Sequence, residues 1–361
     1  MKYNLFNINK YNIDTTKFSH LLDDDVKYKF EEEFAKYVGA KYACTASSAS
    51  ILLYMSAKFF MQEMPEEKKS RFPFFIPSMI PPAVPNIISN LGYQAVWTDD
   101  VDWVGSPYVF YDTNLPMKCT SCPKAQERTY PIIIDSSQEV TRNQFSTGSK
   151  SPSDIMIFSL YPTKPIGGLD GGIVVTDDIQ AARYFKTATN LGFNDSKFEN
   201  NNEKSKPKIP ESIRRELDEA EADFDNTTDE VMKLRQRVAE LEKEQLQTQA
   251  RDDGGKSWRK ELVMPGWKAN ANSAQCYVAL ENLKKLDEKN SRLLQIQEKY
   301  NTFFELSNKS LHLYRINVRD REVFMGEMEA AGIEVGIHYH ALHNHEFYEF
   351  IKPPNMEKTN I

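Results

Sequence analysis

Over the first 192 residues, short apolar runs alternate with longer stretches in which apolar residues recur at helical spacing. Runs with the length of buried strands occupy 41–45, 72–76, 94–98, 130–135 and 155–160. Helical spacing covers 26–38, 47–61, 83–91 and 178–191. Glycine stops three of these stretches, at Gly39, Gly92 and Gly192. This alternation predicts an α/β domain built around a mostly parallel sheet.

The pattern changes between Gly192 and Gly266, which are separated by 73 residues. From position 213 to 241, apolar or small residues recur in alternating steps of four and three, flanked by Glu, Lys and Arg. This heptad spacing predicts a helix over 211–248, about 57 Å long at 1.5 Å per residue. Two arrangements fit it: a coiled coil with another subunit or protein, and a single solvated helix laid on its own domain.

The last hundred residues return to mixed spacing and predict a small α+β domain. Helix, strand, helix and strand are expected in turn over 273–304, 311–318, 322–331 and 333–339. The chain is therefore divided into a large domain over 1–197, an inserted helical segment over 198–262, and an interdomain helix with a small domain over 263–361.

Composition narrows the classes of function. The formal net charge of −7 and the pI near 5.6 argue against a nucleic-acid partner, which a basic patch would bind. No run of 18 apolar residues is present and no apolar signal segment follows Met1, so no membrane span and a cytoplasmic location are expected. Cys119 and Cys122 form a lone CxxC pair without the second pair of a zinc ribbon, which favours reduced, metal-free thiols.

Candidate chemistry gathers where two predicted strands end. Lys164 follows the run at 155–160, and four glycines lie within the next eight residues. Asp135 ends the run at 130–135, and residues 46–50 are small or hydroxyl-bearing at the start of an apolar helix. Each feature alone has an ordinary explanation: a surface lysine, a strand-end aspartate and a serine helix cap. Together, a lysine, a carboxylate and a helix N-terminus suited to phosphate are three parts of a pyridoxal phosphate site.

Short motifs in a fixed order carry a resemblance to a known family. They read FEEEFAKYVG at 30–39, two serines at 47–48, DSSQ at 135–138, FSLYPTK at 158–164 and two glycines at 171–172. In this order and spacing the chain resembles the DegT/DnrJ/EryC1/StrS family of sugar aminotransferases. The resemblance implies the type I fold of pyridoxal phosphate enzymes. That fold has a large three-layer α/β/α domain with a smaller C-terminal domain, and pyridoxal 5′-phosphate is its cofactor.

The resemblance also implies roles for individual residues. Lys164 is implied as the catalytic lysine that binds the cofactor covalently and later moves a proton. Asp135 is implied to keep the pyridine nitrogen protonated, and Ser159 to bind the phosphate beside the helix start. The cofactor-binding residues predicted in this way are Ala49, Ser50, Asp135, Gln138, Ser159, Lys164, Lys268 and Asn270.

A second part of the resemblance concerns a partner subunit and the substrate. The turn GWKAN at 266–270 resembles one that reaches the neighbour's cofactor phosphate in a homodimer. The segment HYHALHNH at 338–345 resembles a turn that faces a nucleotide-linked sugar. The substrate-side residues predicted there are His338, Tyr339 and His343. The implied reaction moves an amino group, usually from L-glutamate, to a keto group of that sugar.

Some positions depart from the family pattern and leave alternatives open. Ala49 stands where glycine is usual, and Pro81 stands where an aromatic ring usually stacks on the pyridine. One alternative is a catalytically inactive relative that acts as a scaffold through the predicted coiled coil. Another is a pyridoxal phosphate enzyme for a non-sugar ketone. The four histidines of 338–345 match no standard zinc spacing, so no metal site is predicted.

Overall fold

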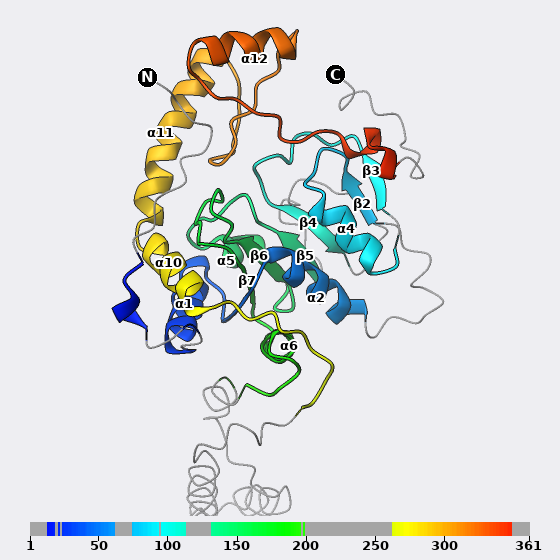
Figure 1. The fold of residues 1–361 in the computed structure, drawn as a ribbon, viewed down its shortest axis with the longest axis vertical. Helices are drawn as coiled ribbons and strands as arrows, with labels where there is room; N and C mark the ends of the chain where they lie inside the picture. The colour runs from blue at the N-terminus through cyan, green and yellow to red at the C-terminus, as the bar shows by residue number, and fades with distance from the viewer. Residues whose placement is uncertain are drawn as a thin grey trace, which may run out of the picture.

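A computed structural model describes residues 13–18, 21, 24–61, 74–93, 95–112, 131–195, 198 and 262–348 (Figure 1). The predicted helix over 211–248 and the Cys119–Cys122 pair lie outside these residues and stay predictions. Within the described part of the chain, no helix combines the length and the apolar character that a membrane span requires.

Among the described residues, seven strands carry much of the buried apolar core. They are β1 (Tyr42–Ala46), β2 (Phe74–Pro77), β3 (Ala95–Thr98), β4 (Tyr108–Asp112), β5 (Ile132–Asp135), β6 (Ile155–Ser159) and β7 (Gly172–Thr176). One sheet has the order β1-β7-β6-β5-β4, and β2 and β3 form a second, parallel pair. Every position of β5, β6 and β7 is buried, which explains why these strands are continuous apolar runs in the sequence.

The prediction of a mostly parallel sheet is wrong for the five-stranded sheet, which is mixed. In it β5 and β6 are parallel, whereas the pairs β1–β7, β6–β7 and β4–β5 are antiparallel. The loop over 160–171 that joins β6 to β7 contains no helix and reverses the chain directly, whereas a crossover to a parallel neighbour usually runs through a helix. An apolar run therefore predicts that a strand is buried but not the direction in which it runs.

The helices pack against the sheet and against one another. They are η1 (Thr15–Lys17), α1 (Asp24–Val38), α2 (Ala49–Met61), α4 (Ala83–Asn90), α5 (Gln144–Gly148), α6 (Ile179–Thr189), α10 (Ser273–Leu283), α11 (Leu286–Phe304), α12 (Arg321–Ala330), η3 (Leu342–Asn344) and η4 (Glu346–Tyr348). Helix α2 contacts β5, β6 and β7, whereas α6 contacts β1 and β7. Helix α10 lies along α1, and α11 leads away from the sheet towards α12 (Figure 1).

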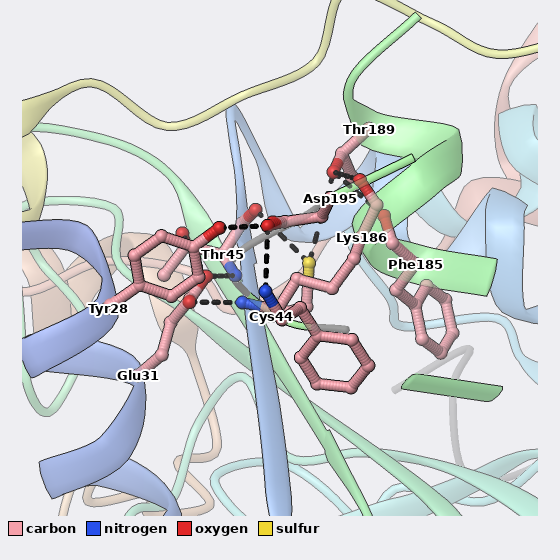
Figure 2. Close-up of polar contacts among 9 residues, drawn as sticks. Tyr28, Glu31, Cys44, Thr45, Phe185, Lys186, Thr189 and Asp195 are labelled. Atoms are coloured by element: carbon pink, nitrogen blue, oxygen red, sulfur yellow. Dashed lines mark hydrogen bonds and ion pairs between the residues drawn. The ribbon is translucent and has the colours of Figure 1, made fainter. Parts of the chain in front are cut away.

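A buried ion pair fastens α1, β1 and α6 together (Figure 2). Lys186 of α6 contacts the carboxylate of Glu31 of α1, and both side chains are 4% exposed. The second oxygen of Glu31 accepts hydrogen bonds from the Thr45 backbone N–H at 2.7 Å and the Thr45 hydroxyl at 2.8 Å. The Lys186 ammonium also lies 4.7 Å from the ring centre of Tyr28. These contacts offset the loss of hydration that burying two charges entails.

The predicted helix over 273–304 is interrupted and forms two helices, α10 and α11. Lys285, at the break, has φ −104° and ψ 1°, outside the helical range. The break accompanies burial of Leu286, and it directs Asp287 towards Tyr37, whose hydroxyl donates to it at 2.6 Å. Tertiary contacts thus override a helical spacing that is continuous in the sequence.

The predicted α+β character of the C-terminal domain is not confirmed. Residues 305–348 contain α12, η3 and η4, and the runs at 311–318 and 333–339 form no strand in this described segment. A strand requires a neighbour that pairs its backbone N–H and C=O groups, and neither run has such a ladder here. The segment after α12 returns to the body of the molecule beside β3, where the Tyr348 ring lies 5.5 Å from that of Trp97 (Figure 1).

Candidate active site

Lys164 lies on a closed loop between two buried strands. Ser159, the last residue of β6, is paired with Gly172, the first residue of β7. Within the loop, the Lys164 N–H donates to Tyr161 O at 2.9 Å and the Gly168 N–H donates to Leu160 O at 2.7 Å. These bonds hold the loop against the edge of the sheet, so the position of Lys164 is set by the backbone around it.

Asp135 comes to the same edge because β5 and β6 run parallel. Its register partner on β6 is Ile157, two residues before that strand ends. Burial lowers the pKa of the Lys164 amine below its ordinary value, and the negative charge of Asp135 opposes this effect in part. The structure therefore brings together the lysine and the carboxylate that the sequence analysis selected.

The Asp135 carboxylate is held by two donors. The Tyr108 hydroxyl donates to Oδ2 at 2.7 Å, and the Ser137 backbone N–H donates to Oδ1 at 2.9 Å. Tyr108 is buried in β4 directly opposite Asp135, and its ring lies 5.1 Å from that of Trp103. Sequence reasoning missed Tyr108, because the only signal was a tyrosine in an apolar run whose register was unknown.

Gln138 links the edge of the sheet to the C-terminal segment. Its Oε1 accepts from the Gly105 N–H at 2.8 Å, and its Nε2 donates to the Tyr339 hydroxyl at 3.2 Å. The Tyr339 ring stacks on Trp103 with ring centres 6.3 Å apart and planes 9° from parallel. Burial and the charge of Asp135 raise the pKa of Tyr339 to about 12. Tyr339, predicted as a substrate residue, therefore lies beside Gln138 and Asp135.

The first turn of α2 meets the start of β7. A Cβ atom on Gly172 would lie 2.5 Å from the Ala49 nitrogen, so only glycine permits this approach. The Ser48 hydroxyl accepts from the Ile51 N–H at 3.2 Å and caps the helix. Because Ser159 pairs with Gly172, its hydroxyl-bearing side chain lies near the same turn as Ala49 and Ser50.

The predicted dimer residues Lys268 and Asn270 lie beside the same helix start in their own chain. The Ser47 N–H donates to Ala269 O at 2.7 Å, and the Asn270 amide donates to Asn190 Oδ1 at 3.2 Å. Lys268 is exposed and forms an isolated bridge with Asn190. Their predicted contact with a neighbouring subunit stays a prediction.

A cleft of about 1950 Å³ opens between the large domain and the C-terminal segment. His338 and Tyr339 line it, together with His312, Arg315 and the C-terminal part of α11. Burial, with the positive charges of Lys164, Lys289 and His338, lowers the pKa of His312 to about 3. Burial and the charge of Lys164 likewise lower the pKa of His338. Lys164 itself is not among the residues that line the cleft, but its charge acts on these two imidazoles of the cleft wall.

His343 is placed differently from His338 and Tyr339. It lies in η3, is 8% exposed and is not among the described residues that line the cleft. Its neighbour Leu342 donates its backbone N–H to Ser78 O at 2.8 Å, which seats η3 on the end of β2. In the described part of the chain no group of three His, Cys, Asp or Glu side chains is arranged to bind a metal ion.

The residues present fit pyridoxal phosphate. Lys164 and Asp135 lie at neighbouring strand ends and interact. They would serve the aldehyde and the pyridine nitrogen of this cofactor, respectively. The start of a 13-residue helix and the Ser159 side chain offer donors for a phosphate a short distance away. The close approach of Gly172 to Ala49 keeps backbone, rather than side chains, at that point.

The same architecture occurs in solved aminotransferases. Helicobacter pylori PseC, an aminotransferase involved in the biosynthesis of pseudoaminic acid, is similar with a TM-score of 0.60 and 16% identity over 100% of this chain and 91% of its own. DesV from S. venezuelae is similar with a TM-score of 0.58 and 16% identity, over 96% of this chain and 83% of its own. The pyridoxal phosphate form of Spr1654, a putative sugar aminotransferase from Streptococcus pneumoniae, has a TM-score of 0.60 and 14% identity, over 97% of this chain and 87% of its own. The chain thus has the fold of these aminotransferases.

The sequence itself assigns the family. The profile of the DegT/DnrJ/EryC1/StrS aminotransferase family matches residues 125–359, more than half of the chain. The chain belongs to this family and is a pyridoxal phosphate-dependent aminotransferase. The resemblance inferred from the short motifs is therefore confirmed.

Proposed function

We propose that this protein transfers an amino group from an amino acid, L-glutamate, to the keto group of a nucleotide-linked sugar. The observation that carries the proposal is the placement of Lys164, with its lowered pKa, beside Asp135 at the open edge of the sheet. The sugar is supported by the family and by the names of similar structures, two of which are described as sugar or pseudoaminic-acid aminotransferases.

Lys164 is proposed as the general base and acid of the reaction. An amine whose pKa is lowered by burial is neutral for a larger fraction of the time at neutral pH, so its Nζ can accept a proton from the reacting carbon and return it. Bound pyridoxal phosphate supplies the electron sink that makes this proton acidic. The closed loop over 160–171 keeps Nζ in one place while the proton moves.

Asp135 is proposed to hold the proton of the pyridine nitrogen. Tyr108 and Ser137 each donate to one of its oxygens, so the carboxylate has a fixed orientation before any ligand arrives. Gln138 is proposed to lie beside the ring, with its amide oriented by Gly105 and Tyr339.

The phosphate is proposed to bind at the first turn of α2. The backbone N–H groups of Ala49 and Ser50 and the hydroxyls of Ser50 and Ser159 are its ligands in this proposal, and the helix dipole favours the negative charge. Lys268 or Asn270 of a neighbouring subunit would complete the site in a homodimer. The exposed position of Lys268 supports this part of the proposal.

The cleft is proposed to bind the nucleotide-linked sugar. His338 and Tyr339 line it and interact with Lys164 and Asp135, so they are placed between the substrate and the reacting groups. Arg315 also lines it, and its guanidinium is oriented by Asp102 at 3.0 Å. The buried place of His343 favours a packing role, with η3 seated on β2, over direct contact with substrate.

The proposal is tested by absorbance of the purified protein with pyridoxal phosphate, before and after L-glutamate is added. The wild type should show a visible band that glutamate bleaches, and Lys164→Ala should form no such band. Lys36→Ala, which removes an exposed lysine on α1, should behave as wild type. A candidate keto sugar that restores the band identifies the acceptor. A wild type without the band would contradict the proposal and favour the scaffold alternative.

A further inference from the structure

The loop that carries Lys164 is held from outside by two side chains of the interdomain helices. Asn282 of α10 donates its amide to Gly167 O at 2.6 Å. Lys289 of α11 donates its ammonium to Pro165 O at 2.5 Å. The two acceptors flank Ile166, which is buried in the core. The backbone directly after Lys164 is therefore attached to α10 and α11 at two points.

Both side chains donate to backbone carbonyls, rather than to water or to the side chains of neighbouring surface residues. Lys289 as a whole is exposed, yet its amine reaches into the loop, where burial lowers its pKa. A charge-assisted hydrogen bond to a carbonyl is stronger than a neutral one and orients the peptide that accepts it. Neither residue belongs to the cofactor or substrate positions described above.

The helices that provide these donors are fixed to the large domain. Asp287 of α11 accepts from the Tyr37 hydroxyl at 2.6 Å, and the Asn290 amide donates to Val140 O at 2.8 Å. Farther along, α11 lines the cleft with Lys299 and Tyr300. One helix therefore connects the cleft wall to the loop of Lys164.

We propose that Asn282 and Lys289 are positioning residues that set the place of Lys164 by clamping the carbonyls of Pro165 and Gly167. Their effect on turnover rests on the proposed function, whereas their effect on the loop does not. Without the clamp the loop loses its two hydrogen bonds to the interdomain helices, and the Lys164 amine samples positions from which proton transfer is slow.

The first measurement is backbone hydrogen exchange of the full-length, cofactor-free protein. Peptides covering 160–171 should exchange roughly fivefold faster in Lys289→Met and in Asn282→Leu, the change expected when one hydrogen bond is lost. Lys285→Met removes an exposed lysine that makes no capping bond at the same helix junction, and it should leave the exchange unchanged. Lys289→Arg retains a donor and should restore most of the protection.

The second measurement is steady-state turnover once an acceptor is known. A loss of positioning should lower kcat roughly tenfold in Lys289→Met while KM changes much less. Unchanged exchange of 160–171 in both single variants would overturn the clamp. Faster exchange with unchanged kcat would overturn the positioning role. Faster exchange in a protein that shows no visible band with cofactor would retain the clamp and contradict only the proposed function.

Discussion

Lys164 and Lys186 both belong to the α/β body of this protein, and their surroundings differ in the distance to a counter-charge. Lys186 is 4% exposed, and its ammonium contacts the carboxylate of Glu31. Lys164 is only partly exposed, and none of the described residues forms an ion pair with it. The charge of Asp135 acts on it without direct contact between the carboxylate and the ammonium. His312 and His338, both with lowered pKa values, are nearby.

The difference separates a structural lysine from a chemical one. A cation in contact with a carboxylate, whose second oxygen is also hydrogen-bonded, holds three elements of the fold together. Where burial affects a cation more than its counter-charge does, its pKa is lowered and it gives up its proton more readily than an ordinary lysine, which a proton-transfer group needs. Residue type and burial alone therefore do not distinguish the two roles, and the position of the carboxylate does.

The largest effect is expected from breaking the structural pair. Glu31→Gln keeps an acceptor for Thr45 but removes the carboxylate that contacts the buried Lys186, and the charge of Asp195 offsets this loss only in part. The free energy of unfolding should therefore fall by about 3 kcal/mol, the low end of the range for breaking a buried pair. The double variant Glu31→Gln with Lys186→Met also removes the buried cation and should recover much of this loss. Urea unfolding of all three proteins measures both effects. A loss below about 1 kcal/mol, typical of exposed pairs, would show that the pair is not a structural anchor.

A smaller effect is expected where Tyr108 holds Asp135. Tyr108→Phe removes one of the two donors to a buried carboxylate, and hydrogen bonds to charged groups contribute about 1.5–3 kcal/mol. The free energy of unfolding should fall by that order, and bleaching of the visible band by glutamate should slow. Tyr42→Phe on β1 is the control and should change neither quantity. An unaltered bleaching rate in Tyr108→Phe would mean that Ser137 alone suffices to orient Asp135.

Most of the large domain could be predicted from the sequence because its signals are local. The apolar runs that became β5 and β6 end at Asp135 and next to the Lys164 loop, so the sequence placed both groups at strand ends. The direction of each strand depends on connections and pairing, which no apolar run encodes. The prediction of a mostly parallel sheet was therefore wrong.

The parts of the site that were missed depend on contacts between distant segments. Tyr108 reaches Asp135 across a strand pair, and Lys289 reaches Pro165 from a helix 124 residues later. Neither residue stands in a motif, and each resembles an ordinary core or surface residue. The break before Leu286 was missed for the same reason, since only burial of that side chain and the contacts of Asp287 interrupt a continuous helical spacing.

The smallest predicted effect concerns the pH dependence of stability at Lys164. Its pKa in the folded cofactor-free protein is lower than the ordinary 10.5 of the unfolded chain, so between these two values the unfolded state binds more protons. Stability should therefore rise with pH across that window, by less than about 1.4 kcal/mol per pH unit for one group.

Lys164→Met removes this contribution. The wild type should gain stability relative to that variant as pH rises from 7 towards roughly 10, measured by urea unfolding at each pH. Lys186→Met does not provide the same comparison, because it breaks the ion pair with Glu31 and lowers stability in its own right. A wild-type advantage that shrinks with rising pH would mean that Asp135 outweighs burial at Lys164, and the two lysines would then differ only in degree.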